Sequence, residues 1–208
     1  MDPDTPILAI SGRIDRQKGI DLVVETIRFI LDETKCQLVV LGSGDNDFRQ
    51  FFQDLEKDYP KRVGTHLRPD FVLPRKIFAG ADMILLPSAY EPGGIVAIEA
   101  MRYGCVPIVR ATGGLADSVK DYNPATNTGT GFNFKTFAKE AFLIGVVRAI
   151  EIYKNKTEWA KIVRRAMDQD FSWEKSAEKY FDLYNRALEF RKETIRPNPP
   201  RAFRQEVT

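Results

Sequence analysis

Two cationic side chains, Arg13 and Lys18, stand close together in the segment SGRIDRQKGID. The segment follows a short apolar run and leads into a stretch with helical periodicity, so we expect both cations on the loop that enters a helix, with Gly12 allowing a tight turn. Cations beside a helix N-terminus suit a diphosphate, because their charge and the free backbone N–H groups converge on the anion. A solvated basic loop is an equally good interpretation of this spacing.

Two carboxylates follow in LLPSAYEPGGIVAIEAMRYG, where Glu91 lies in a Pro- and Gly-rich turn and Glu99 lies in the next helix. This helix is predicted to be apolar on nearly every side and therefore central. A carboxylate in such surroundings costs several kcal/mol unless hydrogen bonds or a cation compensate. Sugar hydroxyls could provide those hydrogen bonds, and a local ion pair with Arg102 is the alternative. For Glu91, the alternative is an exposed turn carboxylate.

Glycine-containing turns accompany these residues. The backbone N–H groups of Gly94 and Ile95 are expected to be free at the start of the Glu99 helix. Gly113 and Gly114 in RATGGLADS are expected to expose N–H groups at the start of another helix. The turn LGSGDND, with Gly42, is weaker, because a lone GxG is more often structural than part of a phosphate site.

Alternating strands and helices are predicted to position these turns. The expected strands cover residues 7–11, 37–42, 63–67, 83–87, 106–110 and 131–134. The expected helices cover residues 20–31, 46–57, 74–80, 94–103, 115–119, 138–153, 157–167 and 173–192, the last capped by Ser172. This order predicts an α/β fold with a Rossmann-like, doubly wound parallel sheet and a C-terminal helical extension. In such sheets, ligands bind beyond the carboxyl ends of the strands, where all four turns would lie.

Composition excludes several classes of protein. Lys and Arg total 31 and Asp and Glu total 29, so the net charge of +2 is too small for a nucleic-acid-binding surface. No run approaches the roughly 18 apolar residues of a membrane span. Cys36 and Cys105 lie in apolar runs without metal-ligand or disulfide-scaffold spacing, which favours a cytoplasmic protein. The single histidine, His66, has no triad partner in sequence and is interpreted as structural.

Several segments together resemble glycogen synthases and starch synthases over about residues 7–184. They are GRIDRQKG, GSGD, IFAGADMILLPSAYEPGGIVAIEAMRYGCVPIVRATGGLADSV, GTGFNF and MDQDFSWEKSAEKY. These retaining hexosyltransferases have a GT-B fold, in which two Rossmann-like domains face a cleft. The resemblance covers only the second domain, which binds ADP-glucose or UDP-glucose. The α-1,4-glucan acceptor lies across the cleft, so we expect the acceptor to need an N-terminal domain, and this chain alone to bind donor without transferring glucose.

The resemblance also implies roles for individual residues. Arg13 and Lys18 would hold the diphosphate and stabilise the leaving group without a metal or other cofactor. Glu91 and Glu99 would match the two glutamates of an E-x7-E pattern, the first near the reacting sugar and the second on the ribose hydroxyls. Further donor contacts are expected from the residues of the surrounding turns, namely Gly12, Gly42, Gly93, Gly94, Ile95, Val96, Thr112, Gly113 and Gly114.

The sequence leaves alternatives for the donor base and for the function. Retained Glu99 and apolar Val96 leave the choice between ADP and UDP undecided, and the base could be stacked weakly by Pro69 or instead by Phe71. A donor domain for a different acceptor and a non-catalytic sugar-nucleotide module are the competing hypotheses, and the oligomeric state is not predicted. The first strand starts so near Met1 that the chain is expected to be part of a longer enzyme. We predict one domain over residues 1–193 and an extended tail over residues 194–208.

Overall fold

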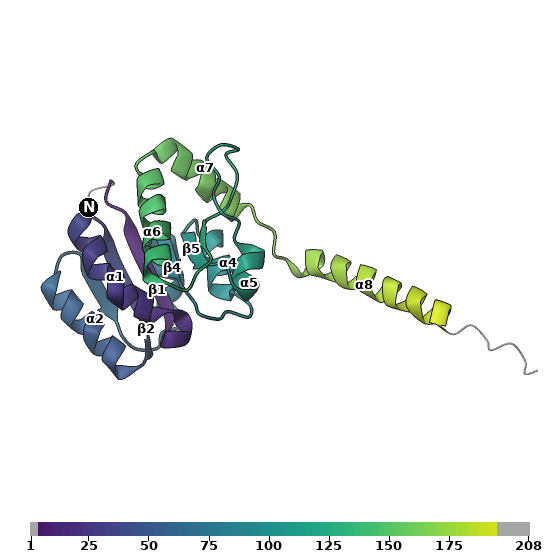
Figure 1. The fold of residues 1–208 in the computed structure, drawn as a ribbon, viewed down its shortest axis with the longest axis horizontal. Coiled ribbons are helices and arrows are strands. Elements are labelled where there is room, and N and C mark those ends of the chain that lie inside the picture. Colours follow the sequence, from purple (N-terminus) through teal and green to yellow (C-terminus); the bar gives the residue numbers. More distant parts are fainter. Residues whose placement is uncertain (1–3, 195–208) are drawn as a thin grey trace, which may run out of the picture. The chain divides into compact units, whose positions relative to one another are not determined.

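A six-stranded parallel sheet forms the centre of the protein, in a computed structural model that describes residues 4–194 (Figure 1). The strand order is β3-β2-β1-β4-β5-β6, and every neighbouring pair is parallel. The strands are β1 (Ile7–Ile14), β2 (Gln37–Gly44), β3 (Val63–His66), β4 (Met83–Leu86), β5 (Val106–Arg110) and β6 (Phe132–Phe134). This order confirms the predicted doubly wound α/β fold.

Helices cover both faces of the sheet, because successive strand residues point to opposite faces. In β1, Leu8 and Ile10 join one apolar core, while Ala9 joins the other. Helices α1, α2 and α6 pack into the first core and α3, α4 and α5 into the second, whereas α7 contributes side chains to both. The helical elements of this unit are η1 (Arg16–Lys18), α1 (Ile20–Glu33), α2 (Asn46–Asp58), α3 (Leu73–Gly80), α4 (Ile95–Arg102), α5 (Gly113–Ser118), α6 (Lys139–Tyr153) and α7 (Lys156–Met167).

Strands β1 and β2 run further than predicted, and this corrects the interpretation of their glycines. Their parallel ladder continues past the predicted ends, pairing Gly12 with Gly42 and Ile14 with Gly44. A Cβ atom built on Gly42 would lie 1.8 Å from the carbonyl oxygen of Gly12. The glycines therefore permit a close approach of two strands, and the tight turn predicted at Gly12 is wrong. The sharp turn predicted at Gly42 is wrong for the same reason.

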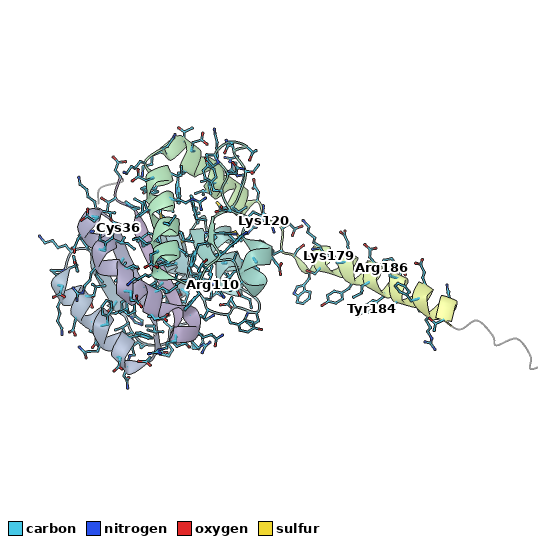
Figure 2. All side chains as sticks on the ribbon, in the orientation of Figure 1. Cys36, Arg110, Lys120, Lys179, Tyr184 and Arg186 are labelled. Carbon is cyan, nitrogen blue, oxygen red and sulfur yellow. The ribbon has the colours of Figure 1, made fainter. Side chains whose placement is uncertain are left out.

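The chain divides into two compact units, residues 1–169 and residues 170–208. The second contains α8 (Trp173–Thr194), where Ser172 accepts a hydrogen bond from Lys175 N at 3.4 Å, as expected of the predicted N-cap. Trp173 is 82% exposed, and further aromatic side chains of this helix are exposed, including Tyr184, which is labelled in Figure 2. The predicted domain over residues 1–193 spans both units, so that division stays a prediction, and the predicted tail beyond Thr194 lies outside the described residues.

None of the helices within residues 4–194 is long and apolar enough to span a membrane.

Candidate functional site

A cavity of about 210 Å³ opens where the strand order reverses, between the carboxyl ends of β1 and β4. In doubly wound sheets, this switch point is where ligands bind, because the connections on its two sides run to opposite faces. We call this space the inner cavity. It is lined by Ile10, Ser11, Gly12, Arg13, Lys18, Ile20, Leu85, Leu86, Ser88, Glu91, Gly94, Val96, Ala97 and Leu115.

Lys18 is held in the inner cavity by the short helix η1. Asp15 caps η1, since its carboxylate accepts a hydrogen bond from Lys18 N at 3.0 Å. The Lys18 Nζ atom lies 2.5 Å from Glu91 Oε2, and the two side chains are only 24% and 14% exposed. Ser88 Oγ contacts the same carboxylate oxygen at 3.4 Å. The predicted cation and the first predicted carboxylate therefore form an ion pair across the switch point.

Arg13 lies at the rim of this cavity and is far more open. It belongs to β1 and not to the following loop, which corrects the predicted placement. Its side chain is 58% exposed, and Nη1 lies 2.6 Å from Asp15 Oδ2. Nη2 donates to Gln17 Oε1 at 2.9 Å. Arg13 is thus tied to its own loop, with its guanidinium accessible to a ligand that reaches the rim.

The N-terminus of α4 faces the same space with unpaired backbone donors. Gly94 is the N-cap with φ 68°, and it brings no side chain to cap the first turn. Within the described residues, no acceptor meets the N–H groups of Gly93, Gly94 or Ile95. A helix N-terminus of this kind attracts anions and hydroxyl oxygens, because its N–H groups lack intrahelical partners.

Glu99 lies one helix turn beyond this region and is half-buried. It makes no hydrogen bond or ion pair with any described residue, and the alternative partner Arg102 instead donates to Met167 O at 3.3 Å. The prediction that this apolar helix is central is wrong, because Ile95 is 68% exposed. Ala97, Ala100 and Met101 are buried, and Val96 and Ile98 are partly buried against the same core.

The glycine pair at the start of α5 supports the Glu91 loop. Gly114 N donates to Glu91 O at 3.0 Å and to Pro92 O at 3.2 Å, and Thr112 N donates to Arg110 O at 2.8 Å. A Cβ atom on Gly113 would lie 2.2 Å from Glu91 O, so no larger residue fits there without a shift. The prediction of exposed N–H groups is therefore wrong for Gly114, whose N–H group already has acceptors.

A second hollow of about 230 Å³ adjoins the inner cavity on the β2 and β3 side. We call it the outer hollow, and it is lined by Ser11, Gly12, Arg13, Leu41, Gly42, Ser43, Arg68, Pro69, Asp70 and Pro74. Phe71 does not line it and is 89% exposed. The Asp70 carboxylate accepts hydrogen bonds from Leu73 N and Val72 N, at 2.7 Å and 2.8 Å, and these lower the pKa of Asp70. His66 Nε2 accepts from Arg68 Nε at 3.1 Å, and the structural role predicted for His66 stays a prediction.

The predicted residues thus fall into three groups. Six of them line the inner cavity, namely Gly12, Arg13, Lys18, Glu91, Gly94 and Val96. Gly42 lines the outer hollow. The others lie nearby on α4, on α5 or beside these helices without lining either space, namely Gly93, Ile95, Glu99, Thr112, Gly113 and Gly114.

Sequence reasoning missed three residues around the Glu91 loop: Gln17, Ser88 and Arg110. Ser88 is fully buried and contacts Glu91, and Gln17 Nε2 donates to Tyr90 O at 3.4 Å. Arg110 binds carbonyl groups of the same loop. A serine three residues before Glu91 of EPGG and a charged residue ending the apolar run VPIV were the available signals.

The cysteines lie apart from this chemistry. Cys36 and Cys105 are buried and free, and burial raises the pKa of both thiols. Elsewhere within residues 4–194, no group of three or more His, Cys, Asp or Glu side chains could hold a metal ion.

Comparison with known proteins places this site in a family. Residues 1–166 match the family described as glycosyl transferases group 1. Glycogen synthase of Thermosipho africanus is 42% identical over 190 residues, which cover 91% of this chain and 39% of that protein. Glycogen synthase of Anoxybacillus flavithermus is 45% identical over 187 residues, covering 90% and 38%. The chain thus spans about two fifths of the curated relatives it matches.

A solved structure agrees with these relatives. The catalytic domain of starch synthase IV from Arabidopsis thaliana, bound to ADP and acarbose, superimposes with a TM-score of 0.80 at 34% identity. The match covers 90% of this chain and 39% of the other. The fold, the site at the switch point and the family match together show that the chain belongs to the glycosyl transferases group 1 family, with glycogen synthases and a starch synthase among its relatives.

Proposed function

We propose that this chain is the donor-binding half of a glycogen or starch synthase and that it binds ADP-glucose or UDP-glucose. The carrying observation is the Lys18–Glu91 ion pair at the switch point, beside the unpaired N–H groups of α4. A cation, a carboxylate and free backbone donors around one cavity suit a ligand that has both a diphosphate and hydroxyl groups. The similarity to a starch synthase bound to ADP supports this class of ligand.

Each part of the donor is assigned to a part of the site. Lys18 and Arg13 bind the diphosphate, and the N–H groups of Gly93, Gly94 and Ile95 bind the phosphates or the glucose. Glu91 contacts the glucose, and Glu99 accepts hydrogen bonds from the ribose hydroxyls. A half-buried carboxylate without a described partner suits that role, because the hydroxyls would replace the water it loses on binding.

Lys18 and Glu91 form an ion pair with each other. A bound diphosphate would draw the Lys18 ammonium toward itself and free Glu91 to accept hydrogen bonds from the sugar. The cations would then stabilise the charge that grows on the departing nucleoside diphosphate as the bond to the anomeric carbon breaks. We propose that no metal or other cofactor shares this task, and that the acceptor attacks the front face of the sugar, with retention of configuration.

The acceptor in this proposal is the non-reducing end of an α-1,4-glucan, held by a part of the enzyme outside this chain. The chain alone would bind donor and not transfer glucose. We place the parent enzyme in the cytoplasm, without a nucleic-acid or membrane partner.

Calorimetric titration of the chain with ADP-glucose, UDP-glucose, ADP and UDP tests the proposal. We expect saturable binding of one sugar nucleotide and of its diphosphate, with glucose 1-phosphate as a control that lacks the nucleoside and one phosphate. The sugar nucleotide that binds more tightly identifies the base that the protein prefers. Absence of binding by all four ligands would refute the proposed function.

A related synthase with a different acceptor is the second candidate. The favouring observation is similarity to sucrose-phosphate synthase from Thermosynechococcus elongatus, with a TM-score of 0.66 and 28% identity over 91% of this chain. Both candidates predict donor binding, so the assay needs the full-length enzyme. Transfer of glucose to an α-glucan, and not to a sugar phosphate, supports the first candidate.

A further inference from the structure

Arg110, which is labelled in Figure 2, ends β5. All three of its guanidinium nitrogens donate to backbone carbonyls. Nε donates to Ser88 O at 2.7 Å, and Nη2 donates to Ala89 O. Nη1 donates to Lys135 O at 3.4 Å, and the guanidinium carbon lies 5.6 Å from the centre of the Phe137 ring. One side chain therefore joins the β4–α4 loop to the segment that follows β6.

The β4–α4 loop has no regular secondary structure, so its carbonyl groups need other partners. Arg110 serves the carbonyls of Ser88 and Ala89, and the next three are served by the side chain of Gln17 and the backbone of Gly114. Gln17 Nε2 donates to Tyr90 O, and Gly114 N donates to the carbonyls of Glu91 and Pro92. The loop is thus fixed at every carbonyl from residue 88 to residue 92, and Arg110 provides the charged, bidentate part of that support.

This support bears directly on the position of Glu91. Ser88, which Arg110 holds by its carbonyl, is fully buried and also contacts the Glu91 carboxylate. Ala89 N donates to Gln17 O at 2.9 Å, so the same stretch is also tied to the loop that carries Lys18. Arg110 itself does not line the inner cavity. Its influence on a ligand there must therefore pass through the loop.

A simpler explanation is that Arg110 only stabilises the fold. Arg148 is an arginine with such a role, because it binds carbonyl groups away from the site. Arg148, on α6, also donates to carbonyl groups, those of Asn133 and Tyr122 at 3.5 Å and 3.3 Å. Its guanidinium carbon lies 5.7 Å from the centre of the Phe132 ring. Both arginines bind backbone carbonyls and lie over a ring, and Arg148 also forms an ion pair with Asp121 at 3.1 Å. Arg148 lines neither the inner cavity nor the outer hollow, and the loop that it holds carries none of the predicted site residues.

We infer that Arg110 is a positioning residue for donor binding: its planar fork holds the Ser88 and Ala89 carbonyls so that Glu91 meets Lys18 at the mouth of the inner cavity. The inference rests on the proposed function. A Lys side chain at this position would keep the charge but place it on one nitrogen, so it could not reproduce a fork spread over three nitrogens. The geometry of Arg110, beyond its charge, is what the loop requires.

Amide hydrogen exchange and donor titration, on the same variants of this chain, test the inference. In Arg110→Gln, we expect hydrogen exchange of the Ala89 amide, which donates to Gln17 O, to rise about 10-fold or more, since the loop loses its charged hydrogen bonds. We expect the sugar nucleotide to bind about 10-fold more weakly, because its contacts are no longer preorganised. Arg148→Gln is the matched control and leaves both quantities unchanged, and Arg110→Lys keeps a folded chain but shares the loss of affinity.

A double-mutant cycle tests whether the effect passes through Glu91. In a Glu91→Gln background, Arg110→Gln should cost only about 2-fold in donor affinity, because coupled residues are not additive. Equal losses of donor affinity with and without Glu91 would overturn the inference. A wild-type exchange rate in Arg110→Gln, or wild-type donor affinity in Arg110→Lys, would also overturn it. The proposed function would stand in each of these cases. If wild-type protein binds no donor, the proposed function fails and the exchange data alone decide whether Arg110 holds the loop.

Discussion

The inner cavity and the outer hollow differ in how they are built, although they share Ser11, Gly12 and Arg13 and have similar volumes of about 210 and 230 Å³. The inner cavity is walled by side chains such as Lys18 and Glu91, which are mostly buried and paired with each other. The outer hollow is walled by Arg68 and Pro69, which are exposed, beside the freely exposed Phe71.

This difference indicates which of the two walls is already ordered before a ligand binds. Groups that packing and hydrogen bonds already hold lose little conformational entropy when a ligand binds, whereas exposed side chains must be ordered at that moment. We therefore expect the diphosphate and sugar to be recognised by a preformed wall and the base by a looser one. The variants below test that ranking, and each change in affinity is measured by calorimetric titration.

Lys18→Gln is expected to have the largest effect. It removes the paired cation of the inner cavity, and loss of a charged hydrogen bond costs about 1.5–3 kcal/mol, or roughly 10- to 100-fold in affinity for the diphosphate. Lys154→Gln is the matched control, because Lys154, just beyond the end of α6, forms an ion pair with Glu151 at a similar distance of 2.6 Å on the exposed surface. Equal affinity of the wild type and Lys18→Gln for the diphosphate would show that Lys18 does not bind it.

Glu91→Gln separates the sugar from the diphosphate. It takes away an acceptor for the sugar hydroxyls, so we expect the sugar nucleotide to bind about 10-fold more weakly, a change of about 1.4 kcal/mol. It also releases Lys18 from its ion pair, so the nucleoside diphosphate alone should bind at least as tightly as before. Parallel weakening of both ligands would contradict the idea that Lys18 changes partner.

Glu99→Gln is expected to have a smaller effect on affinity. The amide keeps one acceptor for the ribose but loses the charge, so a loss of about 1 kcal/mol, or roughly 5-fold, is reasonable. Since Glu99 has no ion pair with a described residue, the free energy of unfolding should change by no more than about 0.5 kcal/mol. A large drop in the unfolding midpoint would instead reveal a structural role for this carboxylate.

Phe71→Ala is expected to have the smallest effect, in affinity and in stability. The ring is 89% exposed and lines neither space, so its removal should weaken donor binding less than about 2-fold. Stacking of a base on an aromatic ring contributes about 1–3 kcal/mol, which would appear as a loss of about 5-fold or more. A loss of that size would show that Phe71 folds over the outer hollow when the donor binds.

The sequence predicted the fold well and placed Lys18 and Glu91 in segments at the same edge of the sheet, because strands and helices depend on local patterns, but it did not predict the ion pair between these two residues. Apolar runs followed by helical periodicity located all six strands, and those strands bring residues from separate turns to one edge of the sheet. Prediction failed where a residue's partner is distant in sequence. The ladder that extends β1 past Gly12 depends on β2, and the N–H group of Gly114 is used by a loop more than twenty positions earlier in the chain.

Arg110 illustrates the same limit. At the end of VPIV, it looks like a boundary between a buried strand and solvent, and nothing local indicates that its three nitrogens meet carbonyls of two other segments. Charged side chains that satisfy backbone groups are recognisable only once the loops they hold have been placed. Their contribution to a site therefore cannot be predicted before the tertiary structure is known.

Each compact unit contains one of the two tryptophans, which serve as intrinsic fluorescence probes. Trp159 in α7 is 6% exposed and packs against Tyr153 and Phe132, whereas Trp173 at the start of α8 is 82% exposed. An indole in an apolar environment fluoresces at shorter wavelengths than one in water, so the two emissions differ in colour. In a Trp173→Phe protein, the remaining tryptophan fluorescence, excited selectively over tyrosine, would follow the unfolding of residues 4–169 without a tryptophan signal from α8.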